Sequence, residues 1–155
     1  MCKVYAIASM KGGVTKTTTS LNLATVLALM GKKVLVADLD PQGSLSICAG
    51  VPNPDTLPHT TYTLLDAVMN EDKLPEPSEY IIPCENIDVI PCNIKLSAFE
   101  LNRGHEIGAE RALQTALAPL RDRYDVIIID TLSAAAICSY VAAPRRMSVI
   151  PLKSP

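Results

Sequence analysis

A segment near the amino terminus combines paired glycines, two lysines and a run of threonines: Ser9-Met10-Lys11-Gly12-Gly13-Val14-Thr15-Lys16-Thr17-Thr18-Thr19. Glycines let backbone N–H groups turn inward and approach an anion closely. Lys16 would add a positive charge at terminal phosphates, and the Thr17 hydroxyl is a ligand type that suits Mg²⁺. A helical pattern follows, so the positive end of a helix would face the anion. The spacing predicts a phosphate-binding loop.

Three carboxylates follow aliphatic runs elsewhere in the chain. Asp38 and Asp40 come after Val34-Leu35-Val36-Ala37, and Asp130 ends the run Val126-Ile127-Ile128-Ile129. In open α/β sheets ligands bind at the carboxyl ends of strands, and a carboxylate placed there can meet Mg²⁺ through water. Asp40-Pro41-Gln42-Gly43 has the signature of a plain turn, and a buried strand often ends in Asp. The order of the three features along the chain favours the functional interpretation.

Alternating strands and helices are needed to bring these side chains together. Val4 to Ala8 predicts a strand buried on both faces. Leu23, Val26, Leu27 and Met30 have the spacing of one helix face, and Gly31 predicts the end of that helix. Residues 34–37 predict the next strand. This is a βαβ unit, which implies a parallel sheet.

The remainder of the chain continues the alternation. The predicted elements form an α/β, doubly wound, mostly parallel sheet in one domain. They are a loop over 44–62, a helix over 63–70, a proline-punctuated stretch over 74–83, a strand over 87–91, a strand-to-helix connection over 92–98, a helix over 106–120 shortened by Pro119, a strand over 124–130, a helix over 134–143 and a strand over 148–152.

Composition narrows the class of protein. The 155 residues carry a net charge of -2, which gives no electrostatic footprint for nucleic acid or an anionic membrane. Five scattered cysteines without CxxC spacing predict reduced, mostly buried thiols. Without a signal peptide pattern or a run of ~20 apolar residues, the sequence predicts a soluble cytoplasmic protein.

The loop fits the pattern KGGxGK(S/T)(S/T) and so resembles the deviant Walker A loop of the ParA/MinD family of partitioning and positioning ATPases. In that family the first lysine, here Lys11, reaches the nucleotide bound by the partner in a sandwich dimer. Thr15 departs from the family's glycine. If that position needs a positive φ, a β-branched residue there costs roughly 1–2 kcal/mol.

The aspartate segment resembles the family's DxDPQG string. The resemblance implies that Asp40 positions the attacking water and that Asp38 supports the metal site. Asp130-Thr131 resembles the start of the family's switch segment, but Leu132-Ser133-Ala134 stands where Pro-Pro-Ser is usual. The implied catalytic residues are Lys11, Lys16 and Asp40, with Thr17, Asp38 and Asp130 around the metal. The implied nucleotide-binding residues are Lys11, Gly12, Gly13, Val14, Thr15, Lys16, Thr17 and Thr18.

The resemblance therefore implies a partitioning ATPase that binds and hydrolyses ATP with Mg²⁺, as an ATP-dependent homodimer with a ParB-like partner. Residues 1–155 would form a single ParA-like P-loop domain without the family's C-terminal part. Because the family's basic residues for DNA lie in that part, direct DNA binding is not expected of this chain, nor is membrane binding. The function is thus predicted from the loop and the aspartates, and from the family that they resemble.

Two alternatives stay open. One is a truncated homologue without hydrolysis that acts as a binding module for a full-length partner. The other is the family's iron–sulfur reductases, for which Cys138 is the candidate ligand although its surroundings do not resemble that family's glycine-rich loop. A colourless purified protein would exclude the second alternative.

Overall fold

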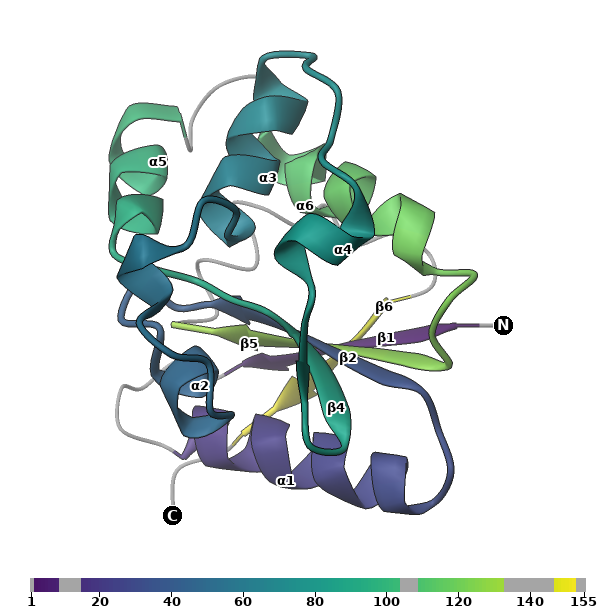
Figure 1. Ribbon diagram of the computed structural model, residues 1–155. Helices are drawn as coiled ribbons and strands as arrows, with labels where there is room; N and C mark the ends of the chain where they lie inside the picture. Colours follow the sequence, from purple (N-terminus) through teal and green to yellow (C-terminus); the bar gives the residue numbers. More distant parts are fainter. Residues whose placement is uncertain (1, 9–14, 104–108, 133–146, 153–155) are drawn as a thin grey trace.

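Six strands form one sheet in the computed structural model, which describes residues 2–8, 15–103, 109–132 and 147–152. The strand order is β3-β4-β2-β5-β1-β6, and only the pair of β3 with β4 is antiparallel. This confirms the predicted mostly parallel α/β sheet (Figure 1). The strands are β1 (Lys3–Ala8), β2 (Val34–Leu39), β3 (Ile82–Cys84), β4 (Ile87–Ile90), β5 (Val126–Thr131) and β6 (Met147–Pro151).

Helices cover both faces of the sheet, as in a doubly wound fold. Two lie on one face, α1 (Lys16–Leu29) and α2 (Ser44–Cys48), with the others on the opposite face (Figure 1). The opposite face carries α3 (Thr61–Met69), α4 (Pro77–Tyr80), α5 (Lys95–Arg103) and α6 (Ala109–Leu117). Short 3₁₀ turns span Pro54–Thr56 and Ala118–Leu120, so α6 ends at Leu117, before Pro119, and its last turn is shortened as predicted.

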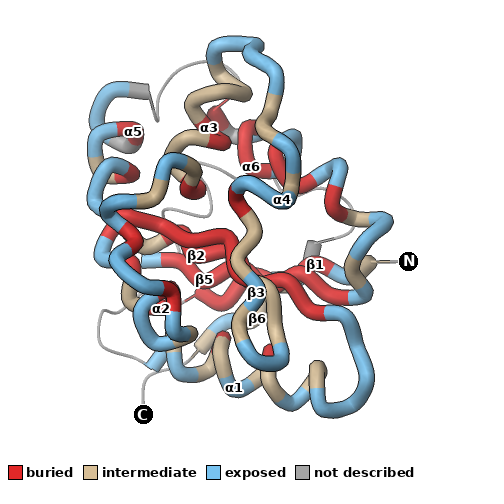
Figure 2. The backbone as a smooth tube through the Cα atoms, viewed as in Figure 1, coloured by how far each residue is buried: buried red, intermediate tan, exposed pale blue. Residues whose placement is uncertain are grey.

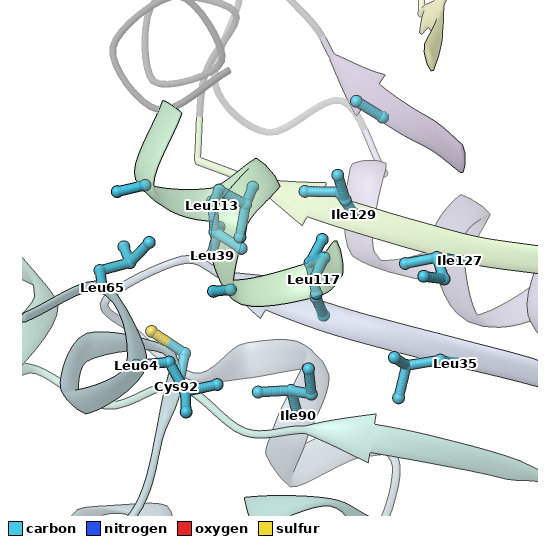
Figure 3. Close-up of a cluster of buried hydrophobic side chains, with 14 of the residues drawn as sticks. Leu35, Leu39, Leu64, Leu65, Ile90, Cys92, Leu113, Leu117, Ile127 and Ile129 are labelled. Carbon is cyan, nitrogen blue, oxygen red and sulfur yellow. The ribbon is translucent and has the colours of Figure 1, made fainter. Parts of the chain in front are cut away.

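The alternation of side chains along β2 builds two cores from one strand. Leu35, Ala37 and Leu39 pack toward α3 and α6, where Leu113 and Leu117 meet them (Figure 3). Val34 and Val36 point to the other face, toward α1. Every residue of β2 and β5 is buried, and the buried residues gather on these central strands (Figure 2). Continuous aliphatic runs are what such doubly covered strands require.

The predicted buried face of α1 is only half right. Leu23 and Leu27 pack against the core, but Val26 is 53% and Met30 69% exposed. The helix is apolar on several sides, so periodicity alone does not single out the buried face. Small Ser20 and Ala24 are the fully buried residues that face the sheet. The helix ends at Gly31 as predicted, with φ +80.

Several elements were missed where proline or short length hides the pattern. The predicted loop over 44–62 contains α2, and the predicted connection over 92–98 begins α5. The proline-punctuated stretch contains α4 and leads into the edge strand β3. An edge strand tolerates Pro83 because one side of it needs no ladder hydrogen bond. The predicted helix over 134–143 lies outside the described residues.

The cysteine prediction needs a correction on burial. The four described cysteines are free thiols, but only Cys92 is buried, Cys48 is exposed, and Cys2 and Cys84 are intermediate. Desolvation is the main cause that raises the thiol pKa of both Cys2 and Cys84. In the described part of the chain, no helix has the length and apolar character needed to cross a bilayer.

Candidate functional site

Two hydroxyls on the first turns of α1 hold the carboxylate of Asp130 at the end of β5. Thr17 Oγ1 donates to Asp130 Oδ2 at 2.8 Å, and Ser20 Oγ donates to Asp130 Oδ1 at 2.7 Å. Thr17 and Ser20 are three residues apart, so they lie on the same helix face. The fold therefore joins the predicted loop hydroxyl to the predicted strand carboxylate across 113 residues of sequence.

The electrostatics of Asp130 place two more predicted residues in this site. Burial raises the pKa of Asp130, and the hydrogen bonds from Ser20 and Thr17 oppose that rise. The nearby Asp40 carboxylate raises the pKa further, whereas the Lys16 ammonium lowers it. Lys16 and Asp40 therefore both act on the Asp130 carboxylate, to which Thr17 is hydrogen-bonded.

Asp38 is fully buried and its carboxylate bonds to the chain itself. Oδ1 accepts from the backbone N–H of Asp40 at 3.0 Å. Oδ2 accepts from both the backbone N–H and the hydroxyl of Ser46, at 2.9 and 2.7 Å. These bonds fix the turn after β2 and the start of α2. Three hydrogen-bond donors thus occupy the oxygens of Asp38. The metal-supporting role predicted for this residue remains a prediction.

Asp40 begins the turn that the Asp-Pro-x-Gly sequence predicts. The N–H of Gly43 donates to the carbonyl of Asp40 at 2.8 Å, and Asp40 Oδ1 accepts from the N–H of Gln42 at 2.9 Å. Gly43 has φ +60, and a Cβ there would lie 2.9 Å from the carbonyl oxygen of Cys92. Glycine is thus required both by the backbone angle and by the close approach to Cys92, two residues after β4.

Burial raises the pKa of Asp38 to about 6, despite the hydrogen bonds from Ser46 and Asp40 that favour its ionised form. Because the folded pKa exceeds the unfolded value of 3.8, the folded state binds the proton more tightly. The stabilising contribution is complete below pH ~4 and is lost as pH rises through ~6, a change of about 3 kcal/mol.

We therefore predict that Asp38→Asn gains stability relative to the wild type as pH rises from 4 to 7, without nucleotide or metal. The asparagine does not titrate, whereas ionised Asp38 weakens the wild-type fold across this range. Urea unfolding of both proteins at each pH gives the difference in their free energies of unfolding. Carboxylates that titrate equally in the two proteins do not contribute to this difference. A difference that is independent of pH would contradict the raised pKa.

Thr15 immediately precedes α1 in a left-handed conformation, with φ 39 and ψ 27. Its carbonyl accepts the N–H of Thr19 at 2.8 Å, which starts the helix. A β-branched residue with positive φ is an outlier, because its Cβ crowds the following carbonyl. The backbone at Thr15 therefore has the positive φ at which a β-branched residue is expected to be strained.

We predict that Thr15→Gly stabilises the fold by about 1 kcal/mol, since the relief of strain exceeds the extra chain entropy of glycine. Denaturant unfolding at constant m-value measures the gain. Thr15→Ala is the matched control, because alanine keeps a Cβ and hence most of the strain. Equal stability of the glycine and alanine variants would show that Thr15 is not strained.

The remaining predicted residues divide into two groups. Thr18 is exposed on the first turn of α1. Lys11, Gly12, Gly13 and Val14 lie outside the described residues, so their predicted roles stay predictions.

The sequence interpretation also missed two buried serines, Ser20 and Ser46, each bonded to an aspartate. A polar residue one turn after Thr17 in an apolar helix was a signal for the first of them.

The donor set suits a hard cation. Mg²⁺ prefers oxygen ligands and is held in proteins by one or two carboxylates together with substrate phosphates. The hydroxyl of Thr17 and the carboxylate of Asp130 are such donors, 2.8 Å apart. Over the described ranges, no group of three or more histidine, cysteine, aspartate or glutamate side chains could hold a metal ion alone. The residues present therefore fit Mg²⁺ bound with a phosphate, rather than an all-protein metal site.

The family model described as "AAA domain" matches residues 2–152. Among curated relatives, the sporulation initiation inhibitor protein Soj of Bacillus subtilis is 36% identical over 150 residues, covering 97% of this chain and 57% of Soj. An uncharacterised protein of Mycobacterium tuberculosis is 40% identical over 128 residues, which are 83% of this chain and 39% of that protein. The chain thus spans about half the length of these relatives.

Solved structures of similar proteins agree with the family match. A plasmid partition protein from Borrelia burgdorferi bound to AMPPNP superposes with a TM-score of 0.68 at 32% identity, over 84% of this chain and 52% of the other. The cobyrinic acid a,c-diamide synthase of Mycobacterium smegmatis, with ADP and magnesium bound, gives a TM-score of 0.74 at 38% identity, over 84% and 50%. Both similar structures hold an adenine nucleotide, or an analogue of one.

Proposed function

Since the chain belongs to the AAA domain family matched over residues 2–152, and within it to the ParA/Soj-type ATPases of the MinD/ParA superfamily, we propose that it binds and hydrolyses MgATP in DNA partitioning. The observation that carries the proposal is the pairing of Thr17 with Asp130 at the N-terminus of α1. Loop hydroxyl and strand carboxylate meet there, as phosphoryl-transfer sites of this class require.

Lys16 and α1 would supply the positive field for the phosphates. Lys16 is the first residue of a 14-residue helix, so its ammonium and the helix N-terminus act at the same place. Thr17 and Asp130 would hold the Mg²⁺, whose charge offsets that of the phosphate oxygens when it is bound. Ser20 keeps the Asp130 carboxylate in one orientation, at 2.7 Å.

Asp40 is proposed to orient the attacking water. Its carboxylate lies on the turn after β2 and raises the pKa of Asp130, which supports a position near the proposed Mg²⁺ ligands. A carboxylate that accepts a hydrogen bond from water aligns the oxygen for in-line attack. The hydrogen bond from Gln42 to Oδ1 restricts the rotation of this side chain.

The finer parts of the proposal concern assembly. The resemblance supports Lys11 reaching across an ATP-dependent homodimer, and it supports a ParB-like partner that regulates hydrolysis. Direct contact with DNA is not proposed for the residues of this chain.

A second candidate is a binding module without turnover, which acts on a full-length partner. It is favoured by Thr15, whose positive φ places strain immediately before Lys16, and by Leu132, which replaces the usual proline after the Asp130-Thr131 pair. Such a chain would bind MgATP poorly or not at all and release no phosphate, and it would act by docking to a full-length relative.

The test is MgATP binding followed by thermal unfolding, on the wild type and Lys16→Ala side by side, with phosphate release measured on the same samples. Binding with turnover supports the ATPase, and binding without turnover supports the second candidate. A cooperatively melting wild type that ignores MgATP would refute the ATPase and support the second candidate, which efficient ATP-dependent dimerisation would rule out.

A further inference from the structure

Ser46 is a fully buried polar residue that links three segments of the chain. Its backbone N–H and its hydroxyl both donate to Asp38 Oδ2, at 2.9 and 2.7 Å. The same hydroxyl oxygen accepts from the backbone N–H of Cys92 at 3.1 Å. One side chain therefore ties the end of β2, the first turn of α2 and the segment after β4.

The other oxygen of Asp38 continues this chain of hydrogen bonds to the turn that carries Asp40. Asp38 Oδ1 accepts from the Asp40 N–H at 3.0 Å, so the backbone of Asp40 is held by the carboxylate that Ser46 orients. The other end of this turn also lies close to the segment after β4, since a Cβ on Gly43 would be 2.9 Å from the carbonyl oxygen of Cys92. Ser46 reaches Asp40 through a single intervening carboxylate.

Thr61 holds the same corner in a different way. Its hydroxyl donates to the backbone carbonyl of Asp38 at 2.7 Å and contacts that of Pro91 at 3.2 Å. Thr61 is as buried as Ser46, with 2% against 0% exposure. It fixes the strand end but does not touch the Asp38 carboxylate. The Thr61 hydroxyl thus stabilises the backbone at the end of β2, whereas the Ser46 hydroxyl orients the Asp38 carboxylate.

We propose that Ser46 is a positioning residue for Asp40, and this inference rests on the proposed ATPase function. Ser46 fixes the rotation of the Asp38 carboxylate, and Asp38 fixes the backbone from which the Asp40 side chain projects. Displacement of a catalytic group by about 1 Å can reduce a rate by about 10²-fold. Ser46 acts on Asp40 through the carboxylate of Asp38, and not on Lys16 or Thr17. Its loss therefore affects turnover rather than nucleotide binding.

The experiment compares Ser46→Ala, Ser46→Thr and Thr61→Val with the wild type. We expect Ser46→Ala to lower kcat roughly 10–100-fold, with KM and the Kd for a non-hydrolysable ATP analogue changed less than about threefold. Ser46→Thr retains the hydroxyl and should restore most of kcat. Thr61→Val is the matched control: it removes a buried hydroxyl from the same corner and should keep kcat within about threefold.

The outcomes separate this inference from the function on which it rests. An active wild type in which Ser46→Ala and Thr61→Val lose kcat equally would overturn the positioning role alone. So would a parallel rise in KM and Kd, or loss of cooperative folding in both Ser46→Ala and the near-isosteric Ser46→Cys. A wild type that releases no phosphate would overturn the ATPase proposal, and this inference with it.

Discussion

Lys16→Ala is expected to abolish the thermal stabilisation that MgATP gives the wild-type chain. A ligand at ~100-fold its Kd stabilises the folded state by about 2.7 kcal/mol. For a domain of this size that free energy corresponds to a rise in Tm of roughly 5–10 °C. The variant should melt at the wild-type temperature without nucleotide and should show no rise with it.

The physical reason lies at the start of α1. Lys16 is the first residue of the helix, and its charge lowers the pKa of Asp130. A triphosphate brings several negative charges next to the Thr17 and Asp130 oxygens, and the variant loses the ammonium that opposes them there. Because Lys16 is partly exposed and lies outside the two hydrophobic cores, its removal should leave the fold intact.

Lys32→Ala is the control for this prediction. Lys32 is exposed just beyond the other end of the same helix, so the variant changes the net charge equally and leaves the site alone. We expect it to keep the full response to MgATP. An equal loss of response in the Lys16 and Lys32 variants would show that the effect is one of overall charge. An undiminished response in Lys16→Ala would remove Lys16 from the nucleotide site.

The strands that carry the site were predictable because a strand buried on both faces requires a continuous run of apolar residues. The runs before Asp38 and Asp130 are continuously aliphatic, and both form central strands in which every residue is buried. Asp38 and Asp130 are also register partners of adjacent strands. Once a parallel sheet is inferred, both carboxylates are expected at the same edge of the sheet. That β2 and β5 are neighbours is known only from the observed strand order.

The short elements around the site were not predictable in the same way. The helix α2 has five residues, too few for a periodic pattern, and it depends on tertiary bonds: Asp38 caps the N–H of Ser46 from outside the helix. Helix formation in so short a segment needs such contacts, because nucleation is unfavourable in isolation. The role of Ser46 is therefore visible only in the folded chain.

Serine–aspartate pairs recur at the ends of the two central strands. Ser20 on α1 holds Asp130, and Ser46 on α2 holds Asp38, each through a hydroxyl bond of 2.7 Å. In both cases a buried carboxylate with a raised pKa receives its donor from a helix on the same face of the sheet. This arrangement fixes two buried charges while leaving the more exposed Asp40 to meet water.

Asp40→Ala is expected to retain MgATP binding and to lose turnover by roughly 10²–10⁴-fold, the range for a positioned acid–base group. Asp40 raises the pKa of Asp130, so the alanine variant makes ionised Asp130 easier to form rather than harder. The groups proposed to bind the phosphates and Mg²⁺ are then unimpaired, and only the acceptor for the attacking water is missing. Single-turnover phosphate release and the MgATP thermal shift measure the two quantities separately.

Asp55→Ala provides the comparison, because Asp55 is an exposed aspartate on the 3₁₀ turn after α2 and its loss changes the net charge equally. It should hydrolyse ATP like the wild type. Unchanged hydrolysis in Asp40→Ala would end the role assigned to Asp40, and the water would then need another acceptor. A loss of binding as large as the loss of turnover would instead mean that Asp40 holds the turn beside the phosphates. The lost hydrogen bond from the Gln42 N–H to the Asp40 carboxylate would be the cause to pursue next, because alanine keeps the backbone carbonyl that accepts from Gly43.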